Sequence, residues 1–195
     1  MEKRPLNLAF DIETDGINST RLHCIVIQDL DSRIIQEYND EPYGDGTFDI
    51  KEDAPMSASY SITAGLTALM DADNIVSHNG IAYDVPQAQK HYPFFRELMA
   101  KHWDTLILSR FYYPNLREMD DKLPDRLKGS HSLEAWGHRL GVYKGNFGQT
   151  SDWKEWSQEM QNYCRQDVAV LVKLWKHFQK ETKGFRDYPK VNRSS

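Results

Sequence analysis

The first part of the chain alternates apolar with smaller or polar positions, a pattern typical of β-strands. The alternation covers residues 6–10. Residues 22–29 and 33–38 are predicted as two further strands, separated by the turn-forming residues Asp31 and Ser32. Consecutive strands with short connections pair antiparallel. The pattern therefore predicts a three-stranded antiparallel meander.

The rest of the chain changes to the spacing of helices. The clearest example is 157–180, where apolar residues recur every three or four positions. Helices are predicted over residues 59–70, 84–91, 105–112 (with Asp104 as N-cap), 131–140 and 157–180. Short strands are predicted at 74–77 and in a segment ending at Trp103, and loops at 40–55, 114–129 and 142–152. This order predicts an α/β fold with a mixed central sheet and flanking helices.

Length and composition favour a single folded domain over residues 1–195. Aromatic residues make up 12% of the 195 residues, more than is typical of disordered chains. The two cysteines, Cys24 and Cys164, are too few for a disulfide framework or a four-thiolate zinc site, which favours a reducing, cytoplasmic setting. We expect neither a secretory signal nor a membrane span, because no apolar run reaches the required length.

The charge is distributed unevenly. The net charge of −5 argues against a simple basic nucleic-acid-binding domain. Residues 36–55 contain seven acidic residues and one basic residue, and a solvated face explains such a run best. Residues 176–195 contain six Lys or Arg and two acidic residues. This basic end is either a frayed terminus or a weak phosphate contact, and the sequence leaves both open.

The first candidate for chemistry is the pair Asp11 and Glu13 at the end of the first predicted strand. Side chains two apart in a strand project from the same face, so the two carboxylates lie side by side. They repel each other unless a cation lies between them, and their hard oxygens suit Mg²⁺ or Mn²⁺. Asp29 and Asp31 share this spacing but lie in a predicted turn, so the spacing alone is a weak signal.

Two later motifs add further acidic groups. The segment 77–84, Ser-His-Asn-Gly-Ile-Ala-Tyr-Asp, follows a short strand and opens a helix. Taken alone, Asp84 is better explained as a cap of that helix. In the long helix, Tyr163 and Asp167 share one face beside the apolar stripe. An Asp beside buried residues is costly unless it is paired, binds a metal or reaches solvent at the edge of the stripe.

In this order, the three motifs resemble the exonuclease motifs of the DEDD superfamily, which comprises 3′-5′ exonucleases with a ribonuclease H-like fold. The histidine subgroup would need His where Asn162 stands, whereas Tyr163 matches the tyrosine subgroup. Segments 78–86, 104–110 and 131–141 are also similar to the proofreading domain of family A bacteriophage replicative DNA polymerases. The resemblance covers residues 6–180 and leaves 181–195 as a basic tail. No polymerase domain follows in these 195 residues, so we expect a stand-alone exonuclease domain.

The resemblance implies a metal site with two divalent cations, Mg²⁺ or Mn²⁺. Asp11, Glu13 and Asp167 would hold the ion that binds the attacking water. Asp11 and Asp84 would hold the ion on the leaving-group side. Tyr163 would orient the water, because a phenol with a pKa near 10 is a poor general base at neutral pH.

The resemblance also implies three substrate contacts. Thr14 would lie near the 3′-hydroxyl, and Asn79 would contact the penultimate nucleotide. Ile17 would insert between the last two bases, although an ordinary core position explains this residue equally well. Stacking and phosphate contacts discriminate little between sequences, so we expect a sequence-tolerant enzyme acting on single-stranded or frayed 3′ ends.

The leading hypothesis is a stand-alone, metal-dependent 3′-5′ DNA exonuclease of phage origin, located in the host cytoplasm. Its partners would be a single-stranded DNA 3′ end and, in replication or proofreading, a separately encoded DNA polymerase. One alternative is an RNA 3′-5′ exonuclease of the same fold. Another is a non-catalytic module that docks on nucleic acid or polymerase, although the complete set of acidic residues argues against it.

Overall fold

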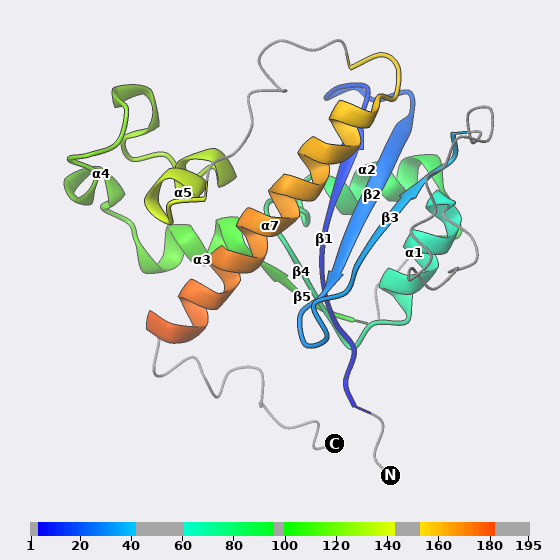
Figure 1. The fold of residues 1–195 in the computed structure, drawn as a ribbon, viewed down its shortest axis with the longest axis horizontal. Helices are drawn as coiled ribbons and strands as arrows, with labels where there is room; N and C mark the ends of the chain where they lie inside the picture. Colours follow the sequence, from blue (N-terminus) through cyan, green and yellow to red (C-terminus); the bar gives the residue numbers. More distant parts are fainter. Residues whose placement is uncertain (1–3, 42–60, 96–99, 143–152, 182–195) are drawn as a thin grey trace, which may run out of the picture.

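A five-stranded mixed sheet forms the centre of the molecule (Figure 1). The computed structural model describes residues 4–41, 61–95, 100–142 and 153–181. The expected loops at 40–55 and 142–152 and the basic tail 181–195 lie almost entirely outside these residues. The strand order is β3-β2-β1-β4-β5. The strands are β1 (Asn7–Thr14), β2 (Leu22–Asp29), β3 (Ile35–Asn39), β4 (Asn74–Ser77) and β5 (Lys101–Asp104).

The pairing confirms the predicted meander and the mixed sheet. β1 pairs antiparallel with β2, with Phe10 opposite Ile27, and β2 pairs antiparallel with β3. β4 runs parallel to β1, and β5 runs parallel to β4. Parallel neighbours need crossover connections. Helices supply them, as the change in sequence periodicity indicates.

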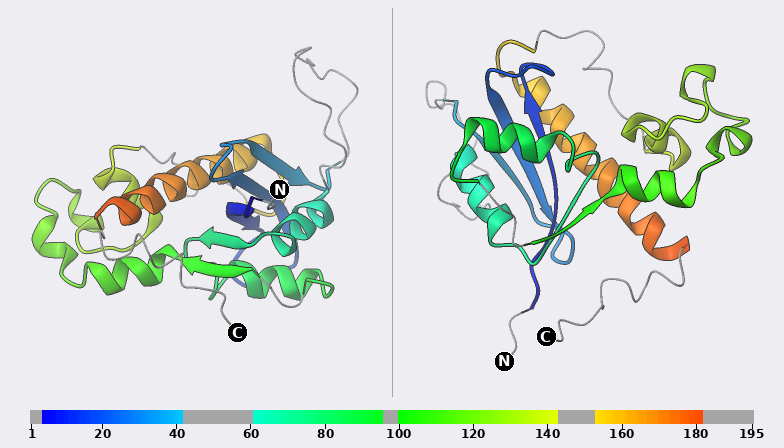
Figure 2. Two further views of the ribbon diagram at one scale, coloured as in Figure 1. Left: turned by 90° about the horizontal axis from the view of Figure 1, so that it is seen from below. Right: turned by 180° about the vertical axis from the view of Figure 1, so that it is seen from behind.

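Helices cover both faces of the sheet. α7 (Gln158–Glu181) crosses the face formed by β1 and β2, while α1 (Ile62–Met70) and α2 (Asp84–His91) lie behind the sheet (Figures 1 and 2). α3 (Thr105–Tyr112) and α5 (Leu133–Arg139) pack against α7. The structure confirms the predicted helices apart from small shifts at their ends, and the expected start of α1 at residue 59 falls outside the described residues.

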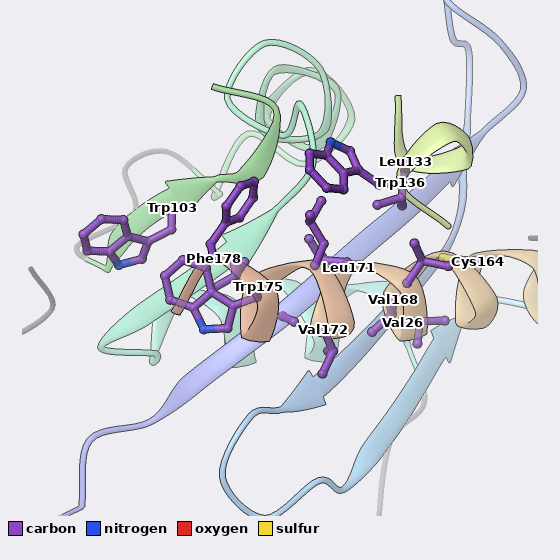
Figure 3. Close-up of a cluster of buried hydrophobic side chains, with 14 of the residues drawn as sticks. Val26, Trp103, Leu133, Trp136, Cys164, Val168, Leu171, Val172, Trp175 and Phe178 are labelled. Carbon is purple, nitrogen blue, oxygen red and sulfur yellow. The ribbon is translucent and has the colours of Figure 1, made fainter. Parts of the chain in front are cut away.

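Successive side chains of β1 point to opposite faces of the sheet and belong to two separate core clusters. Ala9 belongs to the cluster under α7, whereas Leu8 and Phe10 belong to the cluster under α1 and α2. Figure 3 shows how the apolar face of α7, from Cys164 to Phe178, fills the first cluster. Burying such a stripe is the main stabilising contribution of an amphipathic helix.

The segment 114–129, expected to be a loop, contains two short helices. These are α4 (Leu116–Met119) and the 3₁₀-helix η1 (Asp125–Leu127). Leu116 and Leu127 are each no more than 3% exposed and fix the segment to the core. Elements this short have too few apolar positions to produce a periodic pattern, so the sequence pattern missed them. In the part of the chain that the structure describes, none of the helices has both the length and the apolar character needed to cross a bilayer.

Candidate active site

The candidate site lies where β1 extends beyond its parallel neighbour. Ala9 is the last β1 residue in register with β4, opposite Val76, so residues 10–14 continue past the end of that ladder. A strand that loses a neighbour leaves backbone N–H groups open on that side. A crevice beside strand ends is also where open α/β sheets place their ligands.

Asp11 and Glu13 lie on the face of β1 that α7 covers. Cys164 of α7 places its Sγ 3.6 Å from a carboxylate oxygen of Asp11 and 3.5 Å from its backbone oxygen. One ligand atom from each of Asp11, Glu13 and Cys164 lies within 4.8 Å of the other two. Burial raises the pKa of the Cys164 thiol well above its ordinary value, so the thiol stays protonated and donates to Asp11.

Asp84, the first residue of α2, fills the opening beside β1. Its carboxylate accepts a hydrogen bond from the backbone N–H of Ile12, between the two β1 acids. Burial raises the pKa of Asp84 to about 7, and the negative charges of Asp104 and Asp167 add to the effect. A nearby cation would favour the ionised form.

The long helix α7 contributes Asp167 and Tyr163. Asp167 is 6% exposed and lines the same cleft as Asp11. Tyr163, one turn earlier, shares its helix face. The Tyr163 ring lies edge-on to Trp153, with ring centres 6.0 Å apart. Acidic groups from β1, α2 and α7 thus converge on one place, and carboxylate oxygens are the donors that Mg²⁺ and Mn²⁺ prefer.

The segment 77–83, called the motif turn below, connects β4 to α2. Asn79 has a φ of 69°, a left-handed conformation that Asn tolerates better than most residues. A Cβ on Gly80 would lie 2.2 Å from Oγ of Ser77, so only glycine fits there. Asn79 lines the cleft, and none of the described residues hydrogen-bonds to its side-chain amide. This amide is therefore available to a ligand.

Tyr83 connects the motif turn to the loop after β1. Its hydroxyl donates to the backbone oxygen of Gly16 at 3.0 Å and lies 2.7 Å from Oγ1 of Thr14. Thr14 is 4% exposed, and its hydroxyl also contacts Gly16. Because the Thr14 hydroxyl is used within the protein, its backbone is the part best suited to approach a substrate.

Ile17 projects from this loop into solvent. Its side chain is 84% exposed, so the explanation as a core residue is wrong. The α2 side chain of Gln87 donates to the backbone oxygen of Ile17 at 3.4 Å, and His91 Nε2 lies 2.7 Å from Oγ of Ser19. Helix α2 therefore holds the loop that presents Ile17. Its insertion between bases stays a prediction.

A cleft of about 510 Å³ extends from the acidic site to Arg110 and His131. Arg110 is exposed and forms no ion pair with the described residues, whereas Arg139 and Arg165 are each bound to a carboxylate. Nδ1 of His131 lies 2.7 Å from Oγ of Ser109, and burial lowers the pKa of His131. The cleft thus has cationic and polar groups at one end and carboxylates at the other.

Sequence reasoning missed two contributions to the site. Cys164 follows Tyr163 and precedes Asp167 by three positions, so helical spacing already placed it beside the acids. Asp104 is the predicted N-cap of α3, which the structure confirms, but it also binds the motif turn. That second role depends on the parallel pairing of β4 with β5, which no local pattern reveals.

The sheet order and the helices on both faces define a domain of the ribonuclease H-like fold class, with an acidic crevice beside β1. Comparison with protein families identifies the family within this fold class. The family described as 3′-5′ exonuclease matches residues 1–183, and the chain belongs to this family. The chain is therefore a 3′-5′ exonuclease domain.

The chain is similar to parts of two phage DNA polymerases. It is 32% identical to the DNA-directed DNA polymerase of Escherichia phage T7 over 84% of this chain, and 34% identical to that of Enterobacteria phage T3 over 86%. The match covers 25% and 26% of those polymerases, so the chain spans about a quarter of the length of these relatives.

Two solved structures share the fold at low sequence identity. The exonuclease domain of Aedes aegypti Nibbler is 15% identical with a TM-score of 0.57, covering 94% of this chain and 82% of that chain. The family B DNA polymerase of the archaeon Pyrobaculum calidifontis is 14% identical with a TM-score of 0.54, covering 89% and 24%. These similarities support the fold class.

Proposed function

We propose that the protein hydrolyses single-stranded DNA, or frayed DNA ends, from the 3′ end to nucleoside monophosphates. The observation that carries the proposal is the convergence of carboxylates from three separate elements beside the end of β1. Burial and mutual repulsion make this cluster costly without positive charge. A cluster that lowers stability in this way is expected where the function requires a negatively charged site.

The donor set fits two divalent cations. Asp11, Glu13 and Asp167 would hold one ion, and Asp11 and Asp84 the other. When bound, such ions activate water and neutralise the negative charge that develops on the attacking and leaving oxygens. The protein's own contribution is to fix these carboxylates: Cys164 donates to Asp11, and the N–H of Ile12 donates to Asp84.

The remaining site residues would position the strand. Tyr163 orients the attacking water through its hydroxyl. The backbone near Thr14 contacts the 3′-hydroxyl, the Asn79 amide binds the penultimate nucleotide, and Ile17 inserts between the last two bases. The exposed Ile17 side chain and the available Asn79 amide support these roles. Contacts of this kind read the backbone and the faces of bases, so cleavage is sequence-tolerant.

DNA is favoured as substrate because the two phage relatives are DNA-directed DNA polymerases. The protein would be phage-encoded and work in the host cytoplasm, either trimming 3′ ends during DNA replication or degrading DNA. Metal-assisted hydrolysis itself does not depend on the sugar, so the test must compare DNA with RNA directly.

A paired digestion tests the proposal. Single-stranded DNA and RNA of one sequence, each labelled at the 5′ end, are incubated with Mg²⁺, Mn²⁺ or a chelator. We expect a ladder that shortens from the 3′ end, needs the metal and is stronger on DNA. Faster digestion of RNA would reverse the substrate assignment. No digestion of either strand would favour a docking module.

The double substitution Asp11→Ala with Glu13→Ala tests the location of the site. We expect activity to fall by roughly three decades or more because both carboxylates next to the reacting phosphate are lost. Folding should persist, since the change removes a repelling pair. The matched control is Asp29→Asn with Asp31→Asn, which alters the same spacing in the β2–β3 turn and should leave activity unchanged. Near-parental activity in the Asp11/Glu13 variant would contradict the assignment.

A further inference from the structure

The junction between β5 and α3 makes an unusual set of contacts with the motif turn. Asp104 is 5% exposed, and its Oδ1 accepts from the backbone N–H of Asn79 at 3.0 Å as well as from Leu106 at 2.9 Å. Its Oδ2 accepts from the N–H of Ile81 at 3.2 Å. A helix cap needs only the bond to α3. The two bonds to the motif turn are additional.

Thr105, the next residue, binds the same turn by a second route. Its hydroxyl donates to the backbone oxygen of Ser77 at 2.9 Å. A threonine hydroxyl has one proton, so the 2.9 Å contact with His78 must be donated by Nδ1–H of the histidine. Thr105 therefore fixes both the backbone of Ser77 and the ring of His78.

These bonds act on a segment that is costly to hold in place. Asn79 has a φ of 69°, and the Ser77–Gly80 approach leaves no room for a Cβ. A non-glycine residue in the left-handed region persists only when its surroundings over-determine it. Asp104 accepts the N–H of Asn79 itself, on the strained residue.

We infer that Asp104 and Thr105 are positioning residues that hold the motif turn in the conformation that binds the substrate strand. The side-chain amide of Asn79 is thereby held in place as well. The inference rests on the proposed function, because Asn79 is the proposed contact with the penultimate nucleotide. Asp104 and Thr105 act through Asn79 and His78. The acidic cluster receives its own support from Cys164 and Ile12.

Two substitutions separate this role from helix capping. Asp104→Asn keeps an oxygen that caps α3 but replaces the acceptor of Ile81 by an NH₂ group. Thr105→Val keeps the shape and removes the hydroxyl, and Thr105→Ser restores it. Asp73→Asn is the matched control: Asp73 also accepts a backbone N–H, that of Leu6 at 2.9 Å, but at the opposite end of β4.

The measurement compares two substrates. One is a single-stranded oligonucleotide, and the other is the p-nitrophenyl ester of thymidine 5′-monophosphate, which has no penultimate nucleotide. Asp104→Asn and Thr105→Val should lower kcat/KM for the oligonucleotide about tenfold and for the ester less than about threefold. Thr105→Ser and Asp73→Asn should leave the ratio of the two unchanged. In an Asn79→Ala background, Asp104→Asn should have no further effect on the ratio.

Two readouts do not depend on turnover. Hydrogen exchange of the Ile81 backbone amide should accelerate in Asp104→Asn, because this amide loses its acceptor. Binding of the oligonucleotide in the presence of Ca²⁺, followed by fluorescence anisotropy, should weaken in parallel with the oligonucleotide kcat/KM.

An equal loss on both substrates, unchanged exchange, or an additive effect in the Asn79→Ala background would overturn the inference. A parent protein that neither binds nor cleaves would overturn the proposed function as well, whereas unaltered variants of an active parent would overturn this inference alone.

Discussion

Asp84 shows most clearly how single residues prepare the site. It is buried among other acids, and burial raises its pKa from 3.8 to about 7. An acid whose pKa is higher in the folded state than in the unfolded state destabilises folding progressively as pH rises between those two values. The metal-free protein therefore bears a cost that a bound cation would relieve.

Asp84→Asn should remove this destabilisation together with one of the proposed metal ligands. In the presence of a chelator at pH 8, we expect the variant to raise the free energy of unfolding by on the order of 2 kcal/mol, since part of the gain is offset by one weaker backbone hydrogen bond. The advantage should vanish below pH 3.8, where Asp84 is protonated in both states. Denaturant titrations across this pH range measure it, and a variant less stable than the parent at pH 8 would contradict the explanation.

Residue-level prediction succeeded where local spacing determines geometry. The shared face of Asp11 and Glu13 follows from the period of a strand, and that of Tyr163 and Asp167 from the period of a helix. The contact between Asp104 and Asn79 could not be predicted in this way. It depends on register, because Ser77 lies opposite Asp104 between β4 and β5.

Among the elements, the α4–η1 segment shows how a region with little secondary structure is held against the domain. The Asp120 carboxylate accepts from Nε and an Nη of Arg139 in α5, at 2.9 and 2.8 Å, and from the N–H of Gly129. Both side chains are largely buried, with 10% of Arg139 and 1% of Asp120 exposed. The Arg139 guanidinium also lies 4.9 Å from the centre of the Trp136 ring. This ion pair therefore links the segment to α5 beside the cleft.

Asp120→Asn should destabilise the fold in a pH-dependent way. The hydrogen bonds from Arg139 hold the pKa of Asp120 below its ordinary value of 3.8. The stabilisation from the ionised Asp120 is therefore fully present above pH 3.8. It is lost as the pH falls through the lower pKa of Asp120 in the folded state. At pH 7 the variant should lose about 3 kcal/mol, since it leaves a buried guanidinium without its charge partner. Chemical denaturation at pH 7 and pH 3 measures both effects; an equal loss at the two pH values would contradict the ionic explanation.

The same segment marks the limit of element prediction. Long elements such as α7 repeat their pattern often enough to be recognised, and β2 contains a continuous run of buried residues from Leu22 to Ile27. α4 and η1 are each fixed by one buried leucine, Leu116 and Leu127. A single apolar residue has no period, so only the tertiary contact identifies these helices.

For the molecule as a whole, the sheet order decides where the site forms. The mixed sheet was predictable from the meander and the later alternation of helices and strands. No local pattern predicts the position of β1 between β2 and β4, because it depends on the parallel pairing of β1 with β4. That position lets β1 extend past β4 and opens the crevice in which acids from β1, α2 and α7 meet.

The central claim is that these acids form one site for two divalent cations, and crystals soaked with Mn²⁺ and thymidine 5′-monophosphate test it most directly. Anomalous scattering at the manganese edge locates the ions without reference to activity. We predict two peaks about 4 Å apart, both within coordination distance of Asp11 and together bounded by Glu13, Asp84 and Asp167. Peaks at other positions, or none in the crevice in a crystal that binds the nucleotide, would contradict the account.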